Sequence, residues 1–220
     1  QPGKISYFSI KVIILDPTEN MNKTDDCSGV IEKTDFSVTE LQDEYYNCTF
    51  IGCNFSNQTI NNPYFEKCVF KQCNFTLAKF TGNLKDVRFI DCKTTGADFS
   101  GISKFSGIFH FEKSALNYVN FYGIKIRNCS FICCNLYEAC FDEADLTSSV
   151  FDRCDLSRTS FFKTNLEKVD FSSAFNFSID PSTNRLKKTV FSEQNLRGLV
   201  THLDIVIKED ENGPDFVQAL

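Results

Sequence analysis

The chain has 220 residues, a formal net charge of −6, 24 phenylalanines, no tryptophan and only two histidines. Phosphates repel a chain of net negative charge, so direct binding to nucleic acid is disfavoured. Two isolated histidines, with no phosphate-binding glycine loop and no nucleophile motif, argue against an enzyme and against a bound cofactor. The apolar segment Ile5 to Leu15 is too short to span a bilayer, so no membrane association is expected.

Residues 1–26 do not share the pattern that organises the rest of the chain. The segment starts at Gln1 and contains the only methionine, Met21. A processed or added leader and a peripheral strand that covers the first coil are both compatible with this composition.

A period of five organises residues 27–178. Thirteen apolar residues stand five apart without a break, namely Phe111, Leu116, Phe121, Ile126, Phe131, Leu136, Phe141, Leu146, Phe151, Leu156, Phe161, Leu166 and Phe171. Because neither a helix nor an ordinary strand buries such a period, we expect the chain to bend a quarter turn per pentad, so that four pentads close a coil of about twenty residues. Stacked coils would pair as parallel β-ladders about 4.8 Å apart, and rings twenty residues apart would form columns.

A small residue stands two positions before most of these central residues, where a narrow coil leaves little room. Eight of the eleven cysteines take this position, namely Cys48, Cys53, Cys68, Cys73, Cys92, Cys129, Cys134 and Cys154. No CxxC motif occurs, and side chains stacked about 4.8 Å apart miss the separation of about 3.8 Å between Cβ atoms that a relaxed disulfide needs. We therefore expect reduced packing thiols, no metal site and a cytoplasmic protein.

Short runs within the repeats carry a family resemblance. They are Cys73-Asn74-Phe75-Thr76, Ala97-Asp98-Phe99-Ser100, Ala144-Asp145-Leu146-Thr147 and Cys154-Asp155-Leu156-Ser157. These runs resemble the A(D/N)LXX signature of pentapeptide-repeat proteins over roughly 36–171. The resemblance implies an all-β fold, a right-handed quadrilateral parallel β-helix.

Residues 176–203 further resemble the C-terminal ends of quinolone-resistance (Qnr-like) members of that family and their uncharacterised bacterial relatives. This likeness implies a DNA-mimicking protein whose partner is DNA gyrase or topoisomerase IV. It also implies a C-terminal end that joins two copies into a homodimer.

The pattern is interrupted at residues 100–110, where twelve positions separate Phe99 from Phe111. Two pentads would leave two residues over. A projecting loop with apolar content is one interpretation, and it offers a protein partner the candidate contacts Ile102, Phe105, Phe109 and His110. Two distorted pentads packed onto the flank of the β-helix are the other.

Charge is divided along the chain. Residues 45–127 carry ten Lys or Arg against five Asp or Glu, whereas residues 128–171 carry four against eight. The acids of the second segment are candidates for a DNA-mimicking surface, namely Glu138, Asp142, Glu143, Asp145, Asp152 and Asp155. Assigned by pentad, they spread over all four faces. A solvated surface therefore explains them equally well, and a general protein-interaction scaffold with an unrelated partner stays open as the alternative function.

Residues 179–208 are expected to form a C-terminal cap. Ser192 could start a short helix in which Leu196, Leu199, Val200 and Leu203 form one apolar stripe. This stripe would cover the open end of the solenoid, join two chains, or do both. Ile205 to Ile207 is expected to form a short strand, and residues 209–220, which are rich in acids, a mobile tail.

Overall fold

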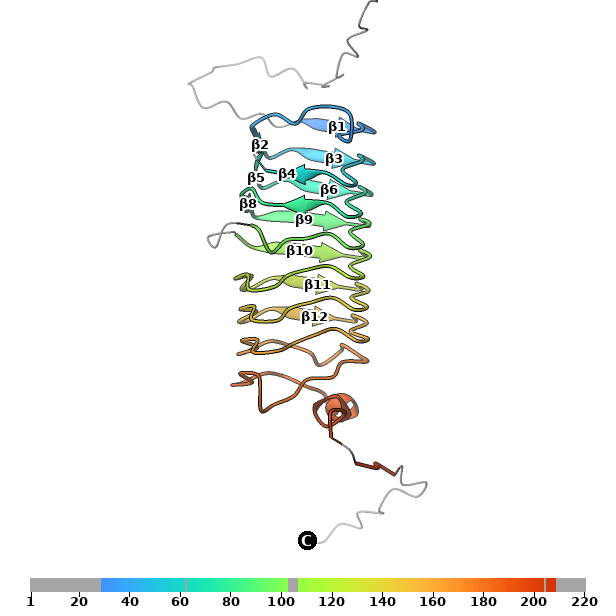
Figure 1. Cartoon of the computed structure of the whole chain (residues 1–220), viewed down its shortest axis with the longest axis vertical. Coiled ribbons are helices and arrows are strands. Elements are labelled where there is room, and N and C mark those ends of the chain that lie inside the picture. Colours follow the sequence, from blue (N-terminus) through green and yellow to red (C-terminus); the bar gives the residue numbers. More distant parts are fainter. Residues whose placement is uncertain (1–28, 62, 103–106, 204, 209–220) are drawn as a thin grey trace, which may run out of the picture.

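The computed structural model describes residues 29–61, 63–102, 107–203 and 205–208, which form a parallel β-helix with its coils stacked along one axis (Figure 1). The strands are short, between two and four residues each. In chain order they are β1 (Val30–Glu32), β2 (Glu44–Tyr46), β3 (Thr49–Ile51), β4 (Thr59–Ile60), β5 (Tyr64–Glu66), β6 (Val69–Lys71), β7 (Lys79–Phe80), β8 (Leu84–Lys85), β9 (Val87–Ile90), β10 (Phe109–Glu112), β11 (Ser130–Ile132) and β12 (Val150–Asp152). The predicted fold class is confirmed.

Parallel pairing defines the faces of this β-helix. One face, which we call the long-sheet face, is a seven-stranded sheet in the order β1-β3-β6-β9-β10-β11-β12. A second face, the short-sheet face, begins with β2-β5-β8 and continues toward the C-terminus as the bridged column Lys125, Asp145, Asn165 and Arg185. The remaining two faces are held by the β4-β7 pair and by isolated parallel bridges.

Stacked aromatic rings fill the interior. The rings of Phe131 and Phe151 lie 4.7 Å apart between centroids and nearly parallel, and Phe111 stacks on Phe131 at 5.4 Å. Phe121 and Phe141 form the opposite column at 4.9 Å. All five rings are fully buried. The columns expected from the period of five are therefore present.

Cysteine side chains pack between these columns. No disulfide joins two of the ten cysteines that lie within the described residues, and eight of the ten are buried. Cys68 Sγ lies 3.3 Å from the carbonyl oxygen of Tyr45, and burial raises the pKa of the Cys129 thiol to about 12. No metal-binding cluster of His, Cys, Asp or Glu occurs in the same part of the chain. The Cys129 thiol therefore stays protonated at neutral pH and acts as a packing group.

Most corners are turned by a residue in the left-handed backbone region, two positions after the central residue. Leu77, Glu138 and Lys168 have φ values of 57°, 53° and 59° there, and Gly123 has 67°. The residue before the central one supports the turn with its side chain. Asn74 Oδ1 accepts the backbone N–H of Thr76 at 3.1 Å, and Asn74 Nδ2 donates to Asn54 Oδ1 in the preceding coil at 3.1 Å. The first bond needs a short side chain with an acceptor oxygen, which Asn and Asp both have, whereas the second needs an amide donor in one coil and an acceptor oxygen in the coil before it. These needs explain why Asp and Asn recur before the central residue.

The stacking continues past position 178, because Asp170 still pairs with Val190. The expected capping helix is then present as a 3₁₀-helix, η1 (Glu193–Leu199). Ser192 N donates to Asn195 Oδ1 at 3.0 Å at its start. None of the helical structure in the described part of the chain has the length and apolar character that crossing a membrane requires.

Candidate partner-binding surfaces

The residues expected to contact a partner from the interrupting loop differ in how far they are exposed. Ile102 is 6% exposed and Phe109 is fully buried, so neither side chain is available to a partner. Phe109 is buried because it belongs to β10, where it takes the inward position two before Phe111. Phe105 lies outside the described residues. Of the three candidates that the structure describes, His110 alone presents part of its ring on the outer surface, on the long-sheet face.

The candidate acids lie on all four faces, as the pentad assignment predicted. Asp152 ends β12 on the long-sheet face, and Asp145 belongs to the column of the short-sheet face. Asp155 and Glu138 flank Leu136 and Leu156 on one of the remaining faces, and Asp142 and Glu143 follow Phe141 on the other. Their charges are therefore not gathered into a single stripe like the phosphates of one DNA strand.

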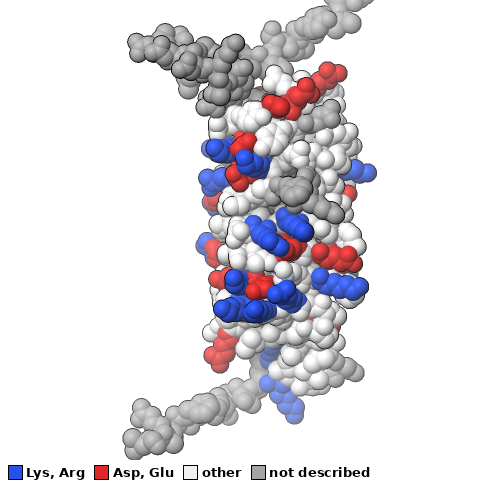
Figure 2. Space-filling view, turned by 90° about the vertical axis from the view of Figure 1, so that its left-hand side faces the viewer, with Lys and Arg blue, Asp and Glu red and all other residues white. Residues whose placement is uncertain are grey.

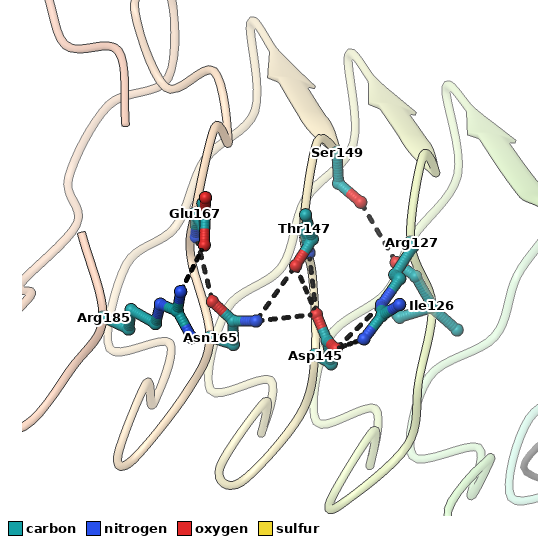
Figure 3. Close-up of polar contacts among 8 residues, drawn as sticks. All are labelled: Ile126, Arg127, Asp145, Thr147, Ser149, Asn165, Glu167 and Arg185. Atoms are coloured by element: carbon teal, nitrogen blue, oxygen red, sulfur yellow. Dashed lines mark hydrogen bonds and ion pairs between the residues drawn. The ribbon is translucent and has the colours of Figure 1, made fainter. Parts of the chain in front are cut away.

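Asp145 shows how such an acid is used inside the fold (Figure 3). Its carboxylate accepts hydrogen bonds from Arg127 Nε at 2.8 Å, from Thr147 N at 3.2 Å and from Asn165 Nδ2 at 3.1 Å. Arg127, Asp145 and Asn165 belong to three successive coils, so this carboxylate ties the coils together. A second ion pair between coils follows on the same face, where Arg185 pairs with Glu167 of the preceding coil at 2.8 Å.

Internal donors also engage most of the other candidate acids. Asp155 accepts from Ser157 N at 3.0 Å and from Asn176 Nδ2 at 3.0 Å. Asp142 accepts from Phe162 N at 2.9 Å. Two surface ion pairs join Glu138 to Arg158 at 3.1 Å and Asp152 to Arg153 at 2.9 Å.

The pKa directions agree with these contacts. Partial burial alone would raise the pKa of Asp145, but the hydrogen bonds from Arg127 and Thr147 outweigh it and lower the value below the usual 3.8. The pKa of Asp155 is lowered in the same way, with burial opposed by the hydrogen bonds from Ser157 and Asn176. Both groups are therefore carboxylates at neutral pH, and each already has several donors.

The C-terminal half of the short-sheet face is basic, which division of charge along the chain did not predict. Its outward and corner positions carry six cations, namely Lys125, Arg127, Lys168, Arg185, Lys187 and Lys188, against Asp145 and Glu167. Figure 2 looks at this side and shows Lys and Arg interleaved with fewer acids. Winding separates sequence neighbours onto different faces, so an acidic segment of sequence does not produce an acidic face.

The C-terminal cap differs from the expected stripe. Leu196 and Leu203 are each 47% exposed, while Leu199 and Val200 are half-buried, so the four do not share one buried face. A 3₁₀-helix has three residues per turn, and the spacing of an α-helical stripe does not apply to it. The residue of η1 that is buried is Gly198, which lies against Phe177. Ile205 to Ile207 form no strand and stand exposed.

Comparisons with known proteins agree with this architecture. A family model described as pentapeptide repeat region matches residues 43–121, and a model of pentapeptide repeats (8 copies) matches residues 139–175. A search of curated proteins by sequence found no match.

Solved structures with the same architecture include QnrB1, a plasmid-mediated fluoroquinolone resistance protein. A trypsin-treated variant of it matches with a TM-score of 0.59 and 19% identity, over 82% of this chain and 87% of that one. HetL, a pentapeptide repeat protein involved in heterocyst differentiation regulation in the cyanobacterium Nostoc sp. strain PCC 7120, matches with a TM-score of 0.32 and 14% identity, over 74% of this chain and 83% of that one.

Proposed function

This chain belongs to the pentapeptide-repeat family, and from that premise we propose that it is a non-catalytic, cytoplasmic protein-binding scaffold that acts on a type II topoisomerase. Its partner would be DNA gyrase or topoisomerase IV, and its effect would be protection against quinolones. The observation that carries this proposal is the similarity in fold to QnrB1, a fluoroquinolone resistance protein, over most of both chains.

The interior supports a scaffold rather than an enzyme. The inward columns consist of close-packed rings, aliphatic side chains and small side chains, so the reacting groups of an enzyme would have to stand on the outside. A rod of this kind presents fixed outer columns to a partner, because every coil is tied to the next by backbone bonds such as Phe141 N to Ser160 O at 2.9 Å. Preorganised surfaces of this kind lose little entropy on binding.

A supercoiling assay tests the proposal directly. Purified gyrase would be assayed with and without a fluoroquinolone at micromolar concentrations of this protein. We expect protection of supercoiling in the presence of the drug and a measurable complex with the enzyme. No protection, no inhibition and no binding would reject the topoisomerase as partner.

Two matched double variants test whether the acids imitate DNA phosphates. The first, Glu143→Gln with Asp152→Asn, removes two charges from the candidate acids. The second, Glu32→Gln with Glu193→Gln, removes two exposed charges near the ends of the rod. DNA mimicry predicts weaker gyrase binding for the first variant alone, whereas equal effects would assign the acids to solubility and coil pairing.

The alternative function is a general protein-interaction β-helix with an unrelated partner. It is supported by exposed apolar side chains at the C-terminal end, where Leu196, Leu203 and Val206 are 47%, 47% and 88% exposed. The same patch could join two copies of the chain. Absence of any topoisomerase effect, together with retained folding, would favour this function.

Light scattering would decide whether the C-terminal end makes a homodimer. Leu196→Glu with Leu203→Glu places two charges in the patch without touching the buried Gly198. Val38→Glu, at an 84% exposed position near the other end, is the matched control. A dimer that only the first variant dissociates supports the proposal, and a wild-type monomer rejects it.

A further inference from the structure

A groove of about 250 Å³ lies on the outer surface of the long-sheet face, across β9, β10 and β11. Parallel register arranges its outward side chains in two rows. Arg88, His110 and Ser130 stand side by side in one row, and Ile90, Glu112 and Ile132 stand side by side in the other. Within a strand the two rows are about 6.6 Å apart, because they lie two residues apart along it.

The first row offers a ligand two hydrogen-bond donors, the guanidinium of Arg88 and the hydroxyl of Ser130. His110 Nδ1 lies 2.7 Å from Ser130 Oγ, and Arg88 is exposed on the other side of the imidazole. When Nδ1–H donates to Ser130, the hydroxyl hydrogen of Ser130 is free to point out of the groove. Within the described ranges the guanidinium of Arg88 makes no ion pair with a carboxylate. An oxyanion placed over this row would therefore meet an uncommitted cation and a hydroxyl donor.

The state of His110 suits this arrangement. Burial lowers the pKa of the imidazole, and the positive charge of Arg88 lowers it further, against a smaller opposing effect of Asp86. A neutral imidazole at pH 7 carries a single N–H, and the hydrogen bond to Ser130 can orient it. The row then presents a single formal positive charge, that of Arg88, which suits a single carboxylate.

The second row determines which chemical group a ligand can carry at the end opposite its carboxylate. Ile90 and Ile132 supply apolar surface, and Glu112 stands between them with Lys113 at 3.5 Å. A second negative charge at this end would be repelled by Glu112, whereas an ammonium group would be attracted. The groove is also smaller than the sites of about 300–1,000 Å³ that hold drug-sized ligands. A short, unbranched molecule with one carboxylate fits these dimensions.

We propose that this groove binds a small carboxylic acid, with the carboxylate on Arg88 and Ser130, the carbon chain on Ile90 and Ile132, and a neutral or amino-bearing end toward Glu112. The site is independent of any topoisomerase partner. It adds a small-molecule ligand to a rod whose other outward columns are coil-pairing ladders.

The chain offers a direct probe, because it has only two histidines. Imidazole NMR signals of His110 would report on the groove, and those of His202, which faces Asp180 at 3.5 Å, would serve as the internal control. Butyrate, 4-aminobutyrate and succinate would be titrated at constant pH up to about 50 mM, well above the millimolar affinity expected of so small a ligand. We expect saturable shifts of His110 alone, with affinity in the order 4-aminobutyrate, butyrate, succinate.

Matched variants assign the contacts. Arg88→Gln should weaken butyrate binding by about tenfold to a hundredfold, because a charged hydrogen bond is lost at an exposed position that does not carry the fold. Lys93→Gln removes the same charge from the adjacent face of the same coil and should leave binding unchanged. Glu112→Gln should abolish the preference for 4-aminobutyrate over butyrate.

Three results would overturn the proposal. The first is an unsaturated shift of both histidines, which is the response to ionic strength. The second is no shift of His110 at the highest concentration. The third is saturable binding that Arg88→Gln leaves intact, which would place the acid elsewhere on the chain.

Discussion

Replacement of Phe141 by alanine tests the central claim that ring columns hold the solenoid together. The Phe141 side chain is fully buried. Its ring stacks on Phe121 at 4.9 Å and on Phe161 at 5.4 Å, and it meets Phe131 and Phe151 edge-on, each at 5.7 Å. The substitution thus removes one ring from contact with four others.

The magnitude follows from burial and from the rigidity of the surroundings. Transfer of a phenylalanine side chain out of water contributes about 1.5–3 kcal/mol, and the cavity left by its removal brings the usual cost of Phe→Ala to about 3–5 kcal/mol. Collapse around the cavity is restricted, because Phe141 N donates to Ser160 O at 2.9 Å and Ala144 N to Phe141 O at 3.0 Å. We therefore expect a loss in the upper half of that range.

Urea denaturation followed by far-UV circular dichroism would measure the change in unfolding free energy. Phe162→Ala is the matched control, since this neighbouring ring is 46% exposed. We expect the control to lose less than about 1 kcal/mol. A loss below about 1 kcal/mol for Phe141→Ala, or equal losses in the two variants, would refute the inward ring column.

Three further changes probe the coil ties, the corners and the cap. Asp145→Ala should lower the free energy of unfolding by about 1.5–3 kcal/mol, because it leaves charged and polar donors without their acceptor. The pKa of Asp145 in the folded protein is lowered from 3.8, so its contribution to stability is present at neutral pH and is lost as the pH falls below 3.8. Urea titrations at a series of pH values should therefore show the difference from wild type shrinking below pH 3.8. Lys168→Gly should increase the free energy of unfolding by about 0.5–1 kcal/mol and so raise the melting temperature, because glycine tolerates the φ of 59° at this corner. A lower melting temperature would contradict backbone strain at the corner. Gly198→Ala should cost about 1–3 kcal/mol, because its Cβ would clash with the Phe177 ring; unchanged thermal unfolding would show that η1 is not seated there.

The fold could be predicted from the sequence because it depends on a short repeat of apolar residues, five positions apart. A ring every five residues, with a small residue two positions earlier, leaves few ways to bury both. The column from Phe111 through Phe151 and the cysteine positions follow from that rule alone. The cap was predicted less well, since the spacing of Leu196 to Leu203 suits an α-helix. The buried contact of Gly198 on Phe177 instead seats a 3₁₀-helix on the last coil.

The surfaces could be predicted only in part, because they depend on which residues winding brings together. Asp145 could be placed on an outward position, but its bonds to Arg127 and Asn165 join residues 18 and 20 positions away. Each donor is unremarkable where it stands in the sequence. The basic character of the short-sheet face was missed for the same reason. Charge must be summed down columns, and the columns are known only once the coil lengths are fixed.

The interruption at 100–110 shows how the stacking takes up extra residues. Most coils advance by about twenty residues, but Phe89 pairs with Phe111, which is 22 residues on. Phe111 in turn pairs with Phe131 across an ordinary step of twenty, so the two additional residues do not shift the rings of the coils that follow. The same ladder register places Arg88, His110 and Ser130 in one row. An interruption two residues shorter would give a coil of ordinary length with His110 still beside Arg88, so the groove depends on the register of the ladder rather than on the length of the interruption.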